Sequence, residues 1–102
     1  CELYRITRKF PSEEKYGLTS QIRRAAVSIA SNIAEGSSRK SKKDQKRFYV
    51  IAYSSSIEVV SQLIIAKRLK YLQDDEYVIL REKMEEITGL IGGLHNSLNP
   101  KP

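Results

Sequence analysis

The sequence predicts an all-α fold, an antiparallel up-down four-helix bundle, on three observations. Between Tyr77 and Leu98, apolar residues recur at alternating intervals of three and four, which is the spacing of the buried seam of a left-handed bundle. No half-buried strand pattern and no hairpin dipeptide compete with this helical pattern. The chain has 102 residues, 40% of them hydrophobic, enough for one core and not for two. We therefore expect a single domain over residues 1–102.

The first helix is expected over about residues 1–9, where Leu3, Ile6 and Phe10 stand at helical spacing before Pro11 stops the helix. The chain opens in what reads as the last turns of a helix and does not begin with Met. We therefore expect this first helix to be truncated, with further residues upstream of Cys1.

The second helix is predicted over about residues 20–35, with Thr19 as its N-cap. Gly36 fits the left-handed position that closes a helix. The buried seam of this helix is expected to consist of residues spaced four, three and four apart, namely Ile22, Ala26, Ile29 and Ile33.

The third and fourth helices are predicted over about residues 42–72 and 75–98. Ser41 is a suitable N-cap for the third helix and Asp74 for the fourth, where acidic residues face the positive end of the helix dipole. The seam of the fourth helix is Tyr77, Leu80, Met84, Ile87, Ile91, Leu94 and Leu98.

The third helix carries more apolar surface than one bundle needs. Its apolar residues sweep roughly 200° of the helix circumference, about twice what one face of a four-helix core requires. Exposed apolar patches of this extent mark interfaces, so we expect self-association. The alternative is that the missing N-terminal portion covers the surplus. The predicted oligomer interface consists of Tyr49, Tyr53, Ile57, Val60 and Ile64.

Charge is distributed unevenly along the chain, whose formal net charge is +6. The segment Asp74–Glu86 is strongly acidic, with six carboxylates against two cations. Such polarity favours an oriented encounter with a polyanion, although a lysine-rich loop can also be no more than solvated surface. The candidate nucleic-acid-binding residues are six cations that share their segment with one carboxylate: Arg39, Lys40, Lys42, Lys43, Lys46 and Arg47.

These cations predict contacts to phosphates without reading of bases. An arginine can fork onto phosphate oxygens, whereas a lysine acts as a point charge. Affinity for nucleic acid would then fall steeply with salt. Tyr49, one turn from Lys46, is a candidate for stacking on an unpaired base, although its interface role is favoured.

Polar side chains inside the apolar helices predict a buried network that fixes the register of the helices. An unpaired buried carboxylate is costly, so Glu58 requires partners on the second helix. The predicted structural network is Arg24, Asn32, Glu35 and Glu58. The alternative, a catalytic pair of Glu35 and Glu58, has no neighbouring histidine, glycine-rich phosphate loop or metal-ligand spacing to support it.

The sequence predicts no enzyme, metal site or cofactor. His95 and Cys1 are the only residues of their types and lie far apart in sequence, so neither a Cys–His dyad nor a zinc site is expected. The single cysteine marks no oxidising compartment. No uncharged apolar run long enough to span a bilayer and no signal peptide is visible, so we expect a cytoplasmic protein with no membrane partner.

The second helix carries a family resemblance. The run from Phe10-Pro11 through Gly17-Leu18-Thr19 to Asn32-Ile33-Ala34-Glu35-Gly36 resembles the signature of the four-helix-bundle proteins encoded by intervening sequences in bacterial 23S ribosomal RNA genes. Later pieces such as Ile57-Glu58 agree. The resemblance implies a bundle that assembles as a homopentameric barrel. It also implies a relation in fold to the accessory variability proteins of diversity-generating retroelements, which bind nucleic acid and a reverse transcriptase through a basic barrel surface.

Taken together, these features predict a non-enzymatic, oligomeric accessory protein that binds the backbone of RNA or DNA through a clustered basic loop. The alternative is a ring-shaped protein-binding scaffold that docks a partner such as a reverse transcriptase or a ribosomal component. In that case the apolar surplus of the third helix, and not the cations, would carry the function.

Overall fold

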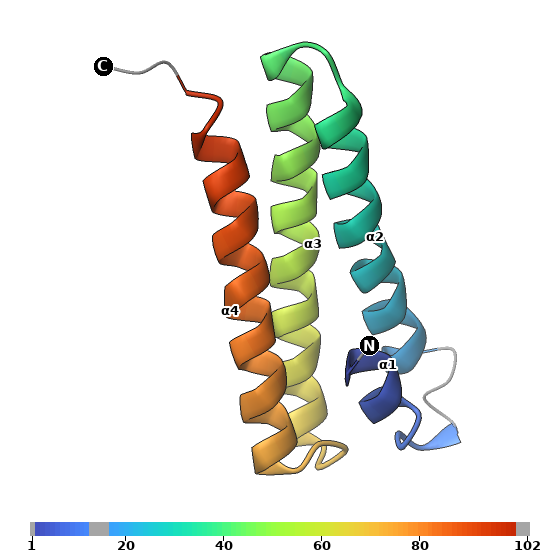
Figure 1. Cartoon of the computed structure of the whole chain (residues 1–102). Helices are drawn as coiled ribbons and strands as arrows, with labels where there is room; N and C mark the ends of the chain where they lie inside the picture. Colours follow the sequence, from blue (N-terminus) through green and yellow to red (C-terminus); the bar gives the residue numbers. More distant parts are fainter. Residues whose placement is uncertain (1, 13–16, 100–102) are drawn as a thin grey trace.

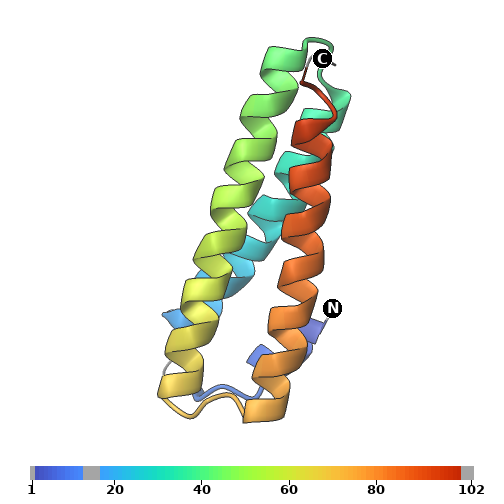
Figure 2. The same cartoon turned by 90° about the vertical axis from the view of Figure 1, so that its left-hand side faces the viewer.

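The computed structural model describes residues 2–12 and 17–99, and these residues form helices and connections without any β-strand. The elongated molecule measures 48 × 24 × 18 Å. Long helices α2 and α4 flank α3, and the short α1 lies near one end of the molecule (Figure 1; Figure 2). The predicted all-α class is therefore confirmed for the described residues. The helices are α1 (Glu2–Thr7), α2 (Leu18–Ser38), α3 (Lys42–Arg68) and α4 (Asp74–Asn96).

Helix α2 is longer at both ends than predicted. Its N-cap is Gly17, and Thr19 is buried inside the first turn, so the predicted cap at Thr19 is wrong. Gly36 does not close the helix in a left-handed conformation, because no described glycine has a positive φ and α2 continues to Ser38. The extended backbone of Arg39 then ends the helix. A glycine is present at position 36 for a packing reason, described below.

Helix α3 begins as predicted and ends earlier. The Ser41 side chain accepts a hydrogen bond from the Asp44 backbone N–H at 3.1 Å, which confirms this cap. The helix ends at Arg68, four residues before the predicted end, because Lys70 adopts a left-handed φ of 64°. The Tyr71 N–H then donates to the Ala66 carbonyl oxygen at 2.9 Å, the bond that closes a Schellman turn.

Helix α4 is capped one residue before the predicted position. Gln73, and not Asp74, is the N-cap, and its backbone N–H donates to the Glu76 carboxylate at 3.0 Å. This contact lowers the pKa of the Glu76 carboxyl below its ordinary value, with the ammonium group of Lys9 as a further cause, while partial desolvation opposes the shift. The Lys9–Glu76 pair, at 3.2 Å, also joins the residues after α1 to the start of α4.

The core follows the predicted seams. In α2, Ile22 and Ile29 are buried, and in α4 the buried residues include Leu80, Met84 and Ile91. The remaining seam residues pack against this core while partly exposed: Ala26, Ile33, Tyr77, Ile87, Leu94 and Leu98. From α3, buried apolar side chains enter the core, namely Tyr49, Ala52, Val59, Leu63 and Ala66.

Helix α1 is held against α2 by polar as well as apolar contacts. Leu3, Ile6 and Phe10 are buried, as their spacing predicts. The Arg23 guanidinium donates to the Thr7 hydroxyl at 3.0 Å and lies 5.0 Å from the centroid of the Tyr4 ring. An apolar groove of about 300 Å³ opens next to α1, lined largely by the facing sides of α2 and α4. That more helical residues precede Cys1 stays a prediction, since Cys1 itself lies outside the described residues.

The wide apolar arc of α3 leaves large side chains exposed to solvent. Tyr53 and Ile57 are each 46% exposed, and Val60 and Ile64 are half-buried. By length and composition alone, α3 would also be able to span a membrane, but core helices of soluble proteins pass the same test. This exposed strip of α3, defined by Tyr53, Ile57, Val60 and Ile64, is called the α3 apolar face below.

Candidate nucleic-acid interface

The six predicted nucleic-acid-binding cations lie together at one end of the molecule. They occupy the connection between α2 and α3 and the first turns of α3, at the top of Figure 1. The acidic start of α4 lies at the opposite end of α3 (Figure 1). At 1.5 Å per residue, the 27-residue α3 separates the two ends by about 40 Å. The segment 39–47 is called the basic end.

The basic end is open to solvent. All six cations are exposed except Lys46, which is half-buried. The Lys46 ammonium donates to the Asn99 side-chain oxygen at 2.7 Å, which ties the residues after α4 to the start of α3. Within residues 2–12 and 17–99, the side chains of Lys40, Lys42 and Lys43 take part in no hydrogen bond or ion pair. Three lysines are thus free to meet anionic groups.

The two arginines of the basic end converge on one aromatic ring. The Arg39 and Arg47 guanidinium carbons each lie 4.9 Å from the centroid of the Phe48 ring. The Arg39 guanidinium also pairs with the Glu35 carboxylate one turn earlier in α2. A guanidinium within about 6 Å of a ring centroid is attracted by the ring quadrupole, so Phe48 orders both arginines. The sequence did not reveal this role of Phe48, because Arg39 lies in the connection before α3 and meets the ring only in the folded chain.

Beneath the basic end, α2 and α3 approach each other closely at Gly36. The Tyr49 ring lies against this glycine, and its hydroxyl is 3.0 Å from the Ser37 hydroxyl. Only 4% of Tyr49 is exposed. The prediction that Tyr49 belongs to the oligomer interface, or stacks on a base, is therefore wrong for this protomer, because α2 already covers its ring. Tyr53 and Ile57 remain exposed, as predicted.

The predicted buried network of Arg24, Asn32, Glu35 and Glu58 does not form. Arg24, Glu35 and Glu58 are exposed. Glu35 pairs with Arg39, and Glu58 accepts a hydrogen bond from the Gln62 amide at 3.3 Å. The sequence pattern did not reveal that Glu58 points to solvent while Gln62, one turn later, is buried.

A smaller polar seam takes the place of the predicted network. The Asn32 amide donates to the Ser28 carbonyl oxygen at 2.8 Å, and the Ser28 and Ser55 hydroxyls are 2.8 Å apart. This contact joins α2 to α3 through small side chains. The carboxylates of Glu35 and Glu58 have separate partners, Arg39 and Gln62, so no contact in the described chain joins them as a catalytic pair.

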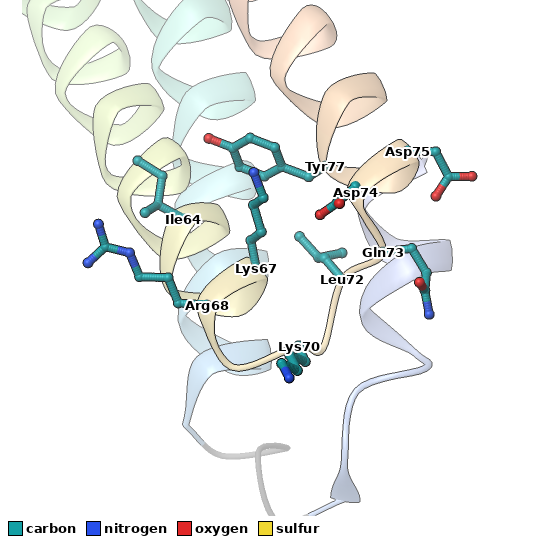
Figure 3. Close-up of a pocket in the computed structure, with 9 residues that line it drawn as sticks. All are labelled: Ile64, Lys67, Arg68, Lys70, Leu72, Gln73, Asp74, Asp75 and Tyr77. Carbon is teal, nitrogen blue, oxygen red and sulfur yellow. The ribbon is translucent and has the colours of Figure 1, made fainter.

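A polar concavity of about 860 Å³ lies at the end of the molecule opposite to the basic end, around the connection between α3 and α4 (Figure 3). Its cations, Lys67, Arg68 and Lys70, share it with Asp74 and Asp75. The Lys67 ammonium lies 4.5 Å from the centroid of the Tyr77 ring, and Figure 3 shows the two side chains against each other. Because its charges are mixed, this concavity suits a polyanion less well than the basic end.

Among the described residues, no group of three or more His, Cys, Asp or Glu side chains is placed to hold a metal ion. His95 lines a small pocket between α3 and α4 together with Tyr53 and Ile91. Cys1, the other residue of the Cys–His dyad considered above, lies outside the described residues.

Comparisons with known proteins agree with this fold. A crystal structure at 1.70 Å resolution of a protein of unknown function, from the S23 ribosomal protein family of Bacteroides thetaiotaomicron VPI-5482, is similar with a TM-score of 0.80. The two sequences are 24% identical, and the match covers 91% of this chain and 84% of that chain. No curated protein matches the chain. Residues 1–93 match the family described as 23S rRNA-intervening sequence protein. The chain therefore belongs to the family of 23S rRNA-intervening sequence proteins, as its sequence motifs predict.

Proposed function

We propose that this protein is a non-enzymatic accessory protein that binds the sugar-phosphate backbone of RNA or DNA through the basic end. The observation that carries the proposal is the clustering of six cations at one tip of an elongated molecule, with three lysines unpaired. Concentrated positive charge attracts nucleic acid and releases counterions when phosphates replace them. The name of the family refers to an RNA gene and not to an activity, so the charges carry the proposal.

We also propose that the protein works as a homo-oligomer, with a pentamer implied by the family resemblance. The α3 apolar face supports self-association, because Tyr53 and Ile57 are large and half-exposed. At 100° per residue, Ile57 lies about 160° around α3 from Val59, which faces the groove between α2 and α4. Any segment that filled this groove would therefore leave the α3 apolar face uncovered. Self-association would bring several basic ends onto one assembly.

The test compares two variants that each lose four positive charges. In the first, Lys42, Lys43, Lys46 and Arg47 at the basic end are all changed to Gln. In the second, four exposed cations near the opposite end are changed to Gln, namely Arg8, Lys67, Arg68 and Lys70. Binding of single-stranded RNA and duplex DNA is measured at roughly 50 and 200 mM salt, because backbone contacts weaken steeply over this range.

The basic-end variant is expected to lose affinity for nucleic acid, and its remaining affinity should depend less on salt. The opposite-end variant is expected to keep most of its affinity and most of its salt dependence. Equal retention by the basic-end variant and the unmodified protein would end the proposal. Equal losses by the two variants would contradict it as well, because net charge and not the basic end would then govern binding.

The competing function, docking of a protein partner by the assembled ring, is favoured by the same exposed side chains, Tyr53 and Ile57. Capture of a reverse transcriptase or ribosomal component would then survive loss of the four basic-end charges and be abolished by Tyr53→Asp or Ile64→Asp. Nucleic-acid binding that depends on the basic end distinguishes the favoured function from this one.

A further inference from the structure

We infer that Phe48 is a positioning residue that holds Arg39 and Arg47 as a paired clamp for neighbouring phosphates of one nucleic-acid backbone. This inference rests on the proposed function and adds to it which side chains grip the phosphates and what arranges them. The two guanidinium groups come from different segments, since Arg39 directly follows the end of α2 and Arg47 lies near the start of α3.

The geometry around the ring supports a clamp. Each guanidinium carbon is 4.9 Å from the centroid of Phe48, so the two groups are no farther apart than twice that distance. Two like charges held this close repel each other, and the shared ring offsets part of that repulsion. A pair of phosphates would offset the rest, because each arginine fork donates two hydrogen bonds to the oxygen atoms of a phosphate.

Glu35 shows that the Arg39 fork already holds an oxygen anion in the free protein. The Glu35 carboxylate pairs with the Arg39 guanidinium, and both side chains are more than 40% exposed. Exposed ion pairs are weak, so an incoming phosphate can join or displace this carboxylate. Carboxylate and phosphate oxygens make the same kind of contact with a guanidinium group. Glu35 therefore occupies the Arg39 guanidinium until a phosphate joins or displaces it.

Gly36 explains why the clamp forms at this corner of the molecule. A Cβ atom at position 36 would lie 3.1 Å from the Phe48 Cβ and 2.7 Å from the Tyr49 ring, so only glycine permits this approach of α2 to α3. The Ser37–Tyr49 contact holds the same corner at 3.0 Å. The Glu35-Gly36 pair of the family signature thus brings Arg39, the residue after α2, within reach of the Phe48 ring.

The clamp also indicates which part of the nucleic acid is gripped. Two guanidinium groups lie over the Phe48 ring, and α2 covers Tyr49. The described part of the basic end therefore presents guanidinium and ammonium groups instead of an open aromatic face. Such a surface suits contacts to phosphates and, over the described residues, offers no open ring on which a base could stack.

The test replaces the ring without changing any charge. In Phe48→Leu the side chain stays apolar but loses its aromatic face, whereas Phe48→Tyr keeps the face and serves as the matched control. Affinity for a single-stranded oligouridylate is measured at roughly 100 mM salt, where backbone contacts are already screened in part. Phe48→Leu is expected to bind about three- to tenfold more weakly, because it loses two exposed cation–π contacts. Phe48→Tyr is expected to bind as the unmodified protein does.

Two further measurements separate positioning from folding. The side-chain proton resonances of Arg39 and Arg47 are expected to be shifted upfield by the ring in the free protein, and Phe48→Leu abolishes that shift while thermal unfolding stays cooperative. In a background of Arg39→Lys and Arg47→Lys, the clamp is already lost at constant charge. Adding Phe48→Leu to that background is expected to cause no further loss of binding.

The outcomes also separate this inference from the function on which it rests. If the basic-end charges matter but Phe48→Leu binds as tightly as the unmodified protein, the clamp is overturned and the proposed function stands. An equal effect of Phe48→Leu in both backgrounds overturns the clamp too, because the ring then acts independently of the arginines. If loss of the four basic-end charges leaves binding unchanged, the proposed function falls and the clamp with it.

Discussion

The backbone of Gly36 in α2 lies directly against the ring of Tyr49 in α3. A Cβ atom at position 36 would be 2.7 Å from the Tyr49 Cε1 atom and 3.0 Å from Cδ1. This contact buries Tyr49 and determines how closely α2 and α3 approach each other near the basic end. The glycine is therefore required by packing between helices, and not by a turn.

Gly36→Ala is expected to destabilise the protein by about 1–3 kcal/mol, because the added methyl group forces the Tyr49 ring or the helices to move. Chemical denaturation measures the change in the free energy of unfolding. Gly89→Ala is the matched control: apart from its chain neighbours and the backbone of its own helix, nothing lies within 4 Å of the added Cβ, so this variant should be more stable by about 0.5–1 kcal/mol. A Gly36→Ala variant as stable as the unmodified protein would contradict the close packing of α2 on α3.

Lys70→Gly is expected to stabilise the protein by about 1 kcal/mol. Lys70 ends α3 with a φ of 64°, a conformation that costs an L-residue free energy and glycine almost none. Lys70→Ala removes the same charge but keeps the Cβ atom, so it should leave stability nearly unchanged. Urea denaturation of the two variants side by side measures the difference, and equal stability of Gly and Ala at position 70 would argue against the left-handed turn.

The proposed self-association predicts that Tyr53→Asp and Ile57→Asp each yield folded single subunits. Each change places a carboxylate on the α3 apolar face, where its burial against another copy would be costly. Sedimentation equilibrium measures the mass of the assembly, and circular dichroism checks the helix content. The control is Val27→Asp on α2, where the side chain is 56% exposed on a different helix. Oligomers that persist in both α3 variants would place the interface elsewhere. An unmodified protein that sediments as one subunit would show that there is no such interface.

Glu76→Gln is expected to reduce stability at neutral pH and to have less effect in acid. The pKa of the Glu76 carboxyl lies below its ordinary value of 4.5 because the carboxylate accepts the Gln73 N–H bond and pairs with Lys9. A lowered folded-state pKa means that the ionised carboxyl stabilises the fold above the unfolded-state pKa. This contribution is lost as the pH falls through the folded-state pKa.

Urea denaturation at pH 7, 5 and about 3 measures how the gap between Glu76→Gln and the unmodified protein changes. The gap should narrow toward acid. Glu86→Gln removes the same charge from an exposed position of α4 and serves as the control. A gap for Glu76→Gln that stays constant across this pH range would show that the carboxylate does not stabilise the start of α4.

The sequence by itself determined the helical class and the buried seams. The three-and-four spacing places Ile22 on the apolar face of α2, and Leu80 and Ile91 on that of α4, whatever each helix packs against. Periodicity alone therefore identifies these buried residues. The same holds for the six clustered cations, since charges next to each other in sequence stay together in space. The family signature in α2 was recognisable for a similar reason, because it is a local run of residues.

The tertiary structure decided what depends on contacts between helices. Glycine is compatible both with a left-handed helix end and with close packing, and only the position of Tyr49 distinguishes the two for Gly36. Glu58 and Gln62 stand one turn apart, and only the placement of the neighbouring helices leaves the first exposed and buries the second. The meeting of Arg39 and Arg47 on Phe48 likewise requires the end of α2 to meet the start of α3. A local pattern encodes which face of a helix is apolar, whereas the partner that covers a given residue is set by how whole helices pack.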